Sequence, residues 1–270
     1  MGRLDAGVLF GGRGGTAVIG AAGEVLEECT STNDVARERL RAGVPDGYVV
    51  ASEYQGAGRG RQGGWVCPPG KGILLSVVLR IRLPARERRL LTILGAVAAA
   101  EAVRSFGVPA RIKWPNDIVI ASHRRGTLRI AKLGGVLVEA EVCGDSAPAH
   151  VLGVGINVNM GPGDLPTGTA TPATSMQNAA GASFRRSAVA RALLTELDGW
   201  YRRIAAGQSE MLLARWRRRS CLVGCQVRAE VGRRVVAGTV RGVRSSGELI
   251  LEVGQGERLL LSDSRARLLP

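Results

Sequence analysis

The chain has 270 residues, of which 45% are hydrophobic and 22% charged. This composition excludes an intrinsically disordered chain, and the length allows one large domain, alone or with a small second one. No apolar run approaches the roughly 18 residues that a membrane span needs, and the first residues lack the features of a signal peptide. We therefore expect a cytoplasmic protein with no membrane partner.

The chain is strongly basic, with a formal net charge of +14 and a pI near 10.9. This balance is compatible with a nucleic-acid partner. However, the aromatic content is only 4%, and the basic residues are dispersed apart from Arg215–Arg219. We therefore interpret the charge as a solvated, arginine-biased surface. The cysteines lack CxxC spacing and the histidines are only His123 and His150, so no zinc site is predicted and any bound metal stays unknown.

The first part of the chain, residues 1–23, is rich in glycine and weakly patterned. Val25–Cys29 predicts a strand. The polar cluster Thr30–Asp34 then predicts a helix N-cap, with Asp34 placed to reach back, before a short helix that ends at Gly43. The hydroxyls and N–H groups of this cap could equally hold a polar ligand.

A glycine-rich basic stretch follows the next predicted strand, Tyr48–Tyr54, which ends at Gln55. Gly56–Trp65 (GAGRGRQGGW) contains too many glycines for a regular element and carries Arg59 and Arg61 at alternate positions. Such a loop beside a strand end can close over a polyanion such as a nucleoside triphosphate. The structural alternative is a flexible surface loop.

The later part of the chain shows clear periodicities. An alternating strand is expected over Ile73–Ile81, a buried strand over His150–Val158, and helices over Leu90–Phe106, Ser187–Ala206 and Ser209–Arg219. After Ser220 the pattern changes to short strands at turn-like intervals, which predicts a small β-barrel of about fifty residues. These strands are expected over Gln226–Val231, Val235–Val243, Glu248–Val253 and Arg258–Leu261.

Lysine is rare in this chain, since Lys71, Lys113 and Lys132 are the only lysines among 37 basic residues. Arginine offers a planar fork, whereas lysine offers a compact point charge that binds phosphate. All three lysines fall in the most motif-rich third of the sequence, so we interpret Lys132 as an anion ligand rather than an accident of composition. Gly134 and Gly135 follow it, and their backbone N–H groups can approach a ligand closely; a strand bend is the alternative.

The segment before Lys132 predicts a pair of strands. Arg111–Trp114 reads as a short strand ended by Pro115, with Asn116 and Asp117 at the turn. A second strand then leads to a polar hairpin tip over Ser122–Gly126.

These motifs, taken together, resemble the biotin protein ligases. STND, EYQGAGRGRQGGW, KWPND, KLGGVLVE and GVGINV occur in this order, and the resemblance runs from Glu24 to the C-terminus. It implies an α+β fold in which a mixed sheet flanked by helices, like that of class II tRNA synthetases, precedes an SH3-like β-barrel. The implied divisions are an N-terminal segment (1–23), a catalytic domain (24–220) and the barrel (221–270). The implied reaction uses ATP with Mg²⁺ to activate biotin as biotinyl-5′-AMP. The biotinyl group then passes to a lysine of a carboxylase's biotin carboxyl carrier domain.

The resemblance also implies roles for individual residues. Biotin would be held by Ser31, Thr32, Asn33, Gln55, Arg59, Gly60, Arg61 and Lys132, and the nucleotide by Arg59, Arg61, Trp65, Asn116, Lys132 and Asn157. The implied catalytic residues are Lys132, Arg61 and Asp117. Lys132 would contact the biotin carboxylate and the α-phosphate. Asp117 is our candidate for assisting the acceptor amine, and a turn-forming aspartate is its alternative.

Some features depart from the family pattern or leave rivals open. Only Gly64 separates Gly63 from Trp65, where the family commonly has two residues, and residues are inserted between Asp117 and Lys132. A lipoate-type ligase shares the scaffold, and a basic nucleic-acid-binding protein is the rival from another class. No helix-turn-helix fits before residue 24, so no sequence-specific DNA recognition is expected. A homodimer is compatible with the sequence.

Overall fold

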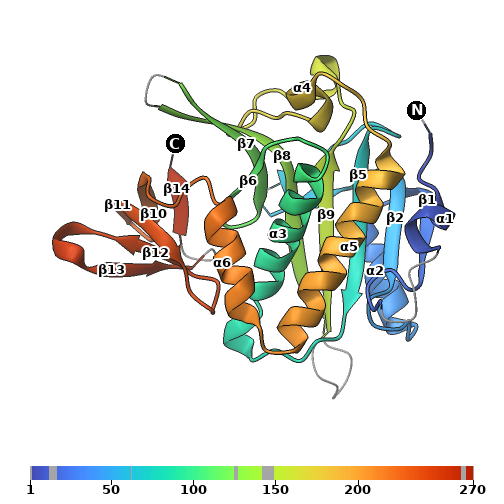
Figure 1. The fold of residues 1–270 in the computed structure, drawn as a ribbon, viewed down its shortest axis with the longest axis horizontal. Coiled ribbons are helices and arrows are strands. Elements are labelled where there is room, and N and C mark those ends of the chain that lie inside the picture. The colour runs from blue at the N-terminus through green and yellow to red at the C-terminus, as the bar shows by residue number, and fades with distance from the viewer. Residues whose placement is uncertain are drawn as a thin grey trace.

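The computed structural model describes residues 2–11, 17–61, 63–124, 127–141, 149–262 and 266–269. Its larger part is one sheet covered by helices, and a smaller sheet lies beside it (Figure 1). The large sheet has seven strands in the order β1-β2-β5-β9-β8-β7-β6. β1 and β2 are parallel, and the other neighbours are antiparallel. This confirms the predicted mixed sheet.

The strands of the large sheet agree with most of the predicted ranges. They are β1 Gly23–Cys29, β2 Val49–Gln55, β5 Gly72–Leu79, β6 Ala110–Lys113, β7 Asp117–Arg124, β8 Thr127–Glu141 and β9 Ala149–Asn157. The expected alternation in β5 is wrong, because all eight of its residues are buried. β5 lies inside the sheet with helices on both faces, so each side of the strand meets a core. The tip between β7 and β8, at residues 125 and 126, lies outside the described residues.

Helices cover both faces of this sheet (Figure 1). α3 Leu90–Arg104, α5 Arg186–Ala205 and α6 Ser209–Arg219 pack on one face with the main core. α2 Thr32–Arg41 packs on the other face through Ala36 and Leu40. The short helix α4, Met176–Ala180, had no predicted counterpart. Among the described residues, no helix has the length and apolarity to cross a membrane.

The N-terminal segment, for which the sequence predicted no element, packs against the large domain. It contains the short helix α1, Ala6–Phe10, and its Leu9 and Ile19 are fully buried in the main core. The backbone N–H groups of Val18 and Ile19 donate to Asp198 of α5 at 2.8 and 3.0 Å. The N-terminal segment therefore contributes two buried side chains to the core, although its sequence pattern is weak.

The C-terminal strands form a five-stranded antiparallel sheet in the order β13-β12-β11-β10-β14, which matches the predicted SH3-like barrel. Its strands are β10 Gln226–Val231, β11 Arg234–Val243, β12 Leu249–Glu252, β13 Arg258–Leu261 and β14 Ala266–Leu269, the last of which was not predicted. The barrel contacts the large domain directly. The Trp114 indole N–H donates to the Gly247 carbonyl at 3.3 Å, and the Cys221 N–H donates to the Ile112 carbonyl at 2.9 Å.

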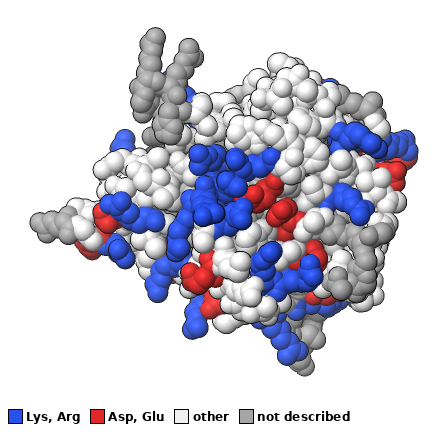
Figure 2. Space-filling view, viewed as in Figure 1, with Lys and Arg blue, Asp and Glu red and all other residues white. Residues whose placement is uncertain are grey.

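Arginines that are dispersed in the sequence gather on one face of the fold. Figure 2 shows Lys and Arg side chains clustered over the ends of α3 and α6, where Arg104 and Arg217–Arg219 complete the last helical turns. Burial lowers the pKa of Arg104, and the neighbouring Arg219 and Arg111 lower it further. Glu101 offsets part of this charge by pairing with Arg215 and Arg219.

Candidate active site

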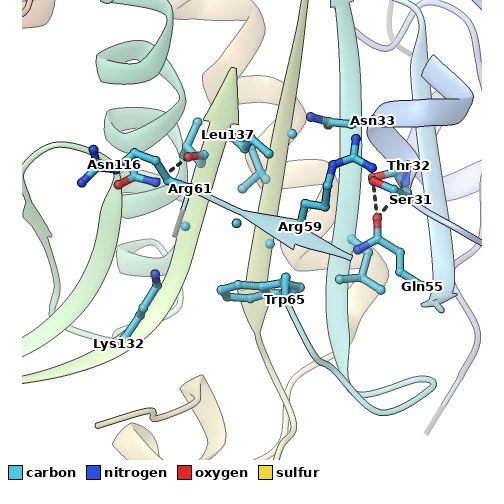
Figure 3. A pocket seen from close by; sticks show the side chains of 17 residues that line it. Ser31, Thr32, Asn33, Gln55, Arg59, Arg61, Trp65, Asn116, Lys132 and Leu137 are labelled. Carbon is cyan, nitrogen blue, oxygen red and sulfur yellow. Dashed lines mark hydrogen bonds between the residues drawn. The ribbon is translucent and has the colours of Figure 1, made fainter. Parts of the chain in front are cut away.

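A pocket opens where the start of α2, the end of β2 and the middle of β8 and β9 meet (Figure 3). It holds about 470 Å³ of unoccupied space, counting its open mouth, which suits a small molecule. Over it lies the Gly56–Trp65 loop, which is not irregular as expected but contains a minimal hairpin, β3 Arg59–Gly60 with β4 Gly63–Gly64. Most predicted site residues line this pocket: Ser31, Thr32, Asn33, Gln55, Arg59, Gly60, Arg61, Trp65, Asn116 and Lys132.

One end of the pocket is built from neutral polar side chains. The Gln55 Oε1 atom accepts from the Thr32 backbone N–H at 2.7 Å and from the Thr32 hydroxyl at 3.0 Å. Ser76 Oγ lies 2.7 Å from Thr32 Oγ1 and 2.6 Å from Asn33 Oδ1. The Asn33 amide nitrogen completes this hydrogen-bond network by donating to Glu139 at 2.6 Å. These mutual bonds fix the orientation of every member before any ligand binds.

The start of α2 differs from the predicted cap. Ser31 occupies the N-cap position, but within the described part of the chain its side chain makes no capping hydrogen bond. Asp34 does not reach back to the cap either; it pairs with Arg37 and Arg59. The polar cluster therefore faces the pocket rather than closing the helix end, which supports the ligand-binding alternative for these residues.

The floor of the pocket is made by two glycines of β9, two residues apart and so on the same face of the strand. A Cβ atom at Gly153 would lie 2.3 Å from Asn33 Oδ1, and one at Gly155 would lie 2.5 Å from the Trp65 ring. Both distances are far below van der Waals contact. Glycine is thus required in GVGINV because Asn33 and Trp65 lie directly against the strand backbone.

The other end of the pocket carries Lys132, on β8. Val119 pairs with Lys132 and Ile118 with Gly134, which leaves Leu133 as the extra residue of a β-bulge. A bulge redirects the side chains around it, and here Leu133 is fully buried while Lys132 reaches the pocket. The Lys132 ammonium lies 2.6 Å from Asp117 Oδ1 and 5.9 Å from the centre of the Trp65 ring.

Two predicted residues lie outside the pocket lining. Asp117 is the ion-pair partner of Lys132. Asn157 donates through its amide to the Thr174 carbonyl at 2.9 Å, and its buried Oδ1 has no partner within the described residues. Asn116 lines the pocket and donates to the Val136 carbonyl at 2.8 Å. In the described ranges, no group of three or more His, Cys, Asp or Glu side chains is placed to hold a metal.

Sequence reasoning missed Ser76 and Glu139, which orient Asn33 by bonding to its side-chain oxygen and nitrogen, respectively. Ser76 had a signal, since it is a lone polar residue in the apolar run ILLSVVL, where a buried hydroxyl must find a partner. Glu139 closes the KLGGVLVE motif, and nothing local to β8 predicts that it contacts α2.

The two loop arginines point to different sides of the pocket. Arg59 lies toward Thr32 and Asn33, whereas Arg61 lies toward Asn116 (Figure 3). Hydrogen bonds from Arg59, followed by those from Arg37, lower the pKa of Asp34 to about 2. The bond to Asp34 in turn raises the pKa of Arg59.

Comparison with known proteins places this pocket in a family. The model of the Biotin/lipoate A/B protein ligase family matches residues 25–158, which contain every pocket-lining residue. The biotin–[acetyl-CoA-carboxylase] ligase of Mycobacterium tuberculosis is 33% identical over 241 residues, covering 86% of this chain and 83% of that protein. The bifunctional ligase/repressor BirA of Bacillus subtilis is 31% identical, covering 86% and 70%. The chain is a biotin protein ligase family member.

The fold agrees with this membership. The biotin protein ligase of Aquifex aeolicus in complex with biotin and ATP superposes with a TM-score of 0.74 at 22% identity, covering 92% of this chain and 98% of that one. The coverage includes most of the barrel as well as the large domain. Neither the lipoate-type alternative nor the nucleic-acid-binding alternative is favoured, because the relatives from Mycobacterium tuberculosis and Paracoccus denitrificans are both biotin–[acetyl-CoA-carboxylase] ligases.

Proposed function

We propose that this ligase activates biotin with ATP to give biotinyl-5′-adenylate and pyrophosphate. It then transfers the biotinyl group to a lysine of a carboxylase's biotin carboxyl carrier domain and releases AMP. One observation carries the proposal: a single glycine-floored pocket joins a prebuilt neutral end to a lysine. Biotin has the same division, with a neutral ureido ring at one end and a carboxylate at the other.

The neutral end suits the ureido ring, which offers one carbonyl acceptor and two N–H donors. Thr32, Asn33 and Gln55 together supply both donors and acceptors, already oriented by Ser76 and Glu139. The valeryl chain would then run between the Asn33 and Trp65 side chains, which themselves lie on Gly153 and Gly155. Its carboxylate would come to the Lys132 end of the pocket.

The nucleotide would enter on the Lys132 side as its magnesium complex, so that Mg²⁺ arrives with the substrate. Arg61 and Asn116 lie at that side, and Trp65 offers an indole face for stacking (Figure 3). Asn157 remains our candidate for a further nucleotide contact, because its buried carbonyl oxygen can accept a hydrogen bond.

In the first step, a carboxylate oxygen of biotin attacks the α-phosphorus of ATP, and the bond to the departing pyrophosphate breaks. Two anions must approach each other, and negative charge builds on the equatorial oxygens of the transferred group. The Lys132 ammonium can lie between them and offset both the repulsion and the developing charge, with Arg61 adding a second cation. Asp117 holds this ammonium in place at 2.6 Å.

In the second step, the neutral amine of the carrier lysine attacks the acyl carbon, and AMP leaves with the electrons of the C–O bond. The attacking nitrogen must lose a proton, and Asp117 is our candidate to accept it. Both ATP and carboxylases are available in the cytoplasm, where we place the reaction.

The test is to incubate the protein with Mg²⁺, α-labelled ATP and biotin, and to look for labelled biotinyl-adenylate. A biotin carrier domain is added next, and loss of label from the adenylate is followed together with the mass gain of the domain. Lipoate replaces biotin in a parallel reaction. We expect adenylate only with biotin. Absence of biotinyl-adenylate, or faster activation of lipoate, would overturn the proposal.

A further inference from the structure

Four charged side chains form a closed ring beside the pocket mouth. Arg59 of the loop donates to both oxygens of Asp34, at 2.6 and 2.7 Å, and lies 3.5 Å from Glu139. Arg37 contacts Asp34 and lies 3.7 Å from Glu139. Two positive and two negative groups thus alternate around the ring, so its formal charge is zero.

The ring connects three elements that are distant in the sequence. Asp34 and Arg37 belong to α2, Glu139 to β8, and Arg59 to the hairpin of the loop. The hairpin has only two residues in each strand, which gives it little rigidity of its own. A bidentate bond between a guanidinium and a carboxylate adds geometric specificity as well as energy. Arg59 is therefore a strong attachment of the hairpin to the body of the protein.

The same ring reaches the neutral end of the pocket. Glu139 accepts from the Asn33 amide at 2.6 Å and also faces Arg59, so one carboxylate contacts both the pocket and the loop. A shift of the loop that moves Arg59 changes the surroundings of the carboxylate that orients Asn33. The position of the loop and the orientation of this amide are thereby linked.

The two loop arginines consequently have unequal environments. Arg59 directs two donors at Asp34 and faces Glu139, so a phosphate that bound it would compete with two carboxylates for the guanidinium. Arg61 lies on the other side of the pocket, toward Asn116 (Figure 3). An incoming anion near Lys132 thus meets Arg61 without disturbing the ring.

We infer that Arg59 is a positioning residue and not an anion ligand: it latches the Gly56–Trp65 loop onto Asp34 and Glu139 and so sets how long a bound adenylate is retained. This assigns the phosphate contact of the loop to Arg61 alone, and it replaces the sequence-based expectation that both arginines bind the nucleotide. The inference about the adenylate rests on the proposed function. The latch itself does not, because it consists of bonds between side chains of the protein alone.

The first experiment therefore uses the ligand-free protein. Hydrogen exchange of peptides covering residues 56–65 is compared in wild type, Asp34→Asn, Arg59→Gln and the double variant. Glu24→Gln is the matched control. Glu24, on β1, pairs at 2.6 Å with Arg39 of α2, the helix that carries Asp34, but it does not touch the loop. Loss of a bidentate charged bond should speed exchange about tenfold in Asp34→Asn and in Arg59→Gln. The double variant should exchange no faster than Arg59→Gln, since that substitution already removes the bonds to both Asp34 and Glu139.

Unchanged exchange in Asp34→Asn, or an equal increase in Glu24→Gln, would overturn the latch. Melting temperatures are measured alongside, so that general destabilisation of the domain is separated from opening of the loop.

The second experiment measures adenylate retention. Proteins are loaded with pre-made biotinyl-adenylate, and its release is followed after a chase. Asp34→Asn should release it about tenfold faster, and Arg59→Gln and the double variant should release it at least as fast and equally with each other. Arg61→Gln should instead slow single-turnover adenylation. Slowed adenylation in Arg59→Gln but not in Asp34→Asn would show that Arg59 binds the anion directly, against the inference. If wild type binds no adenylate, the proposed function fails while the exchange result still decides the latch.

Discussion

At one end of the pocket, Thr32, Asn33 and Ser76 are almost completely buried and bond to one another and to Gln55. At the other end, the Lys132 side chain keeps 33% of its surface exposed and contacts one carboxylate, Asp117. The neutral end satisfies its hydrogen bonds within the protein, because an unpaired buried polar group there would cost free energy. The charged end stays partly hydrated, so its ammonium can exchange water for new anionic partners.

This difference indicates a division of labour. Preorganised neutral hydrogen bonds select a ligand by shape and by its pattern of donors and acceptors, whereas a charge that meets developing charge accelerates a reaction. Substitutions at the neutral end should therefore change ligand affinity, and those at the charged end should change the rate of chemistry. The predictions below test this separation.

The largest effect is expected for Lys132→Ala. Without the ammonium, a carboxylate and an α-phosphate would face each other uncompensated, and losing one such preorganised group costs on the order of 3 kcal/mol, about a hundredfold in rate. The measurement is single-turnover formation of biotinyl-adenylate at saturating biotin and ATP. The melting temperature should be nearly unchanged, because the side chain lies at the pocket and not in the core.

Lys132→Arg sharpens this prediction. Arginine restores the charge but presents a planar fork in place of a compact ammonium, so the variant should stay impaired. Transfer from pre-made adenylate to a carrier domain is measured separately, so that the two steps are distinguished. Adenylation at the wild-type rate would mean that only the charge matters and that the scarcity of lysine in this chain carried no information about the site.

The second prediction compares the two floor glycines. Gly153→Ala drives a methyl group against Asn33, and Gly155→Ala drives one against Trp65. Overpacking of this kind typically costs 1–3 kcal/mol, so each substitution should weaken its own ligand about tenfold. Gly153→Ala should raise the Kd for biotin and Gly155→Ala the Kd for ATP, both measured by calorimetry. If either variant weakens both ligands equally, the two ends of the pocket are not independent.

Much of this site could be predicted from the sequence because its members lie within short motifs. Lys132 stood out as one of three lysines, and it is the one that lines the pocket. The other two lie outside the pocket lining, where Lys71 pairs with Asp164 and Lys113 donates to Thr171. The pairing of Lys132 with Asp117 could not be foreseen, because it depends on a β-bulge that alters the register between β7 and β8.

The fold shows the same limit. Periodicity located the long helices and most strands, since each buries a regular face of its own. It failed for α1, whose five residues are too few to show a period, and for the end of the barrel at β14. It also failed for the charged ring, where Asp34, Arg59 and Glu139 are brought together by tertiary structure alone.

A third prediction examines the neutral end directly. Gln55→Ala removes the acceptor that orients the Thr32 N–H and hydroxyl, and a net loss of about 1 kcal/mol in biotin binding should raise the Kd about fivefold. Gln55→Glu keeps an oxygen in the same place and should bind biotin more tightly than the alanine variant. Equal weakening in both would indicate that the amide nitrogen of Gln55, rather than its oxygen, is what biotin needs. The rate of adenylation at saturating biotin should change little in either.

The smallest effect is expected for the pH dependence of the loop that covers the pocket. The pKa of Asp34 is lowered to about 2, chiefly by its hydrogen bonds with Arg59. A carboxyl group whose pKa is lowered by folding stabilises the folded arrangement above its unfolded pKa, near 3.9, and this contribution is lost only as the pH falls through the lowered value. The ring should therefore hold the loop equally well from pH 8 to pH 5 and weaken only below about pH 4.

Hydrogen exchange of residues 56–65, corrected for its intrinsic pH dependence, should give constant protection from pH 8 to pH 5. Asp34→Asn should give lower protection with the same flat profile, because the titrating group is gone. Loss of protection in wild type with a midpoint between pH 5 and pH 7 would show that a group other than Asp34 controls the loop, and that the bond to Arg59 is not what keeps it closed.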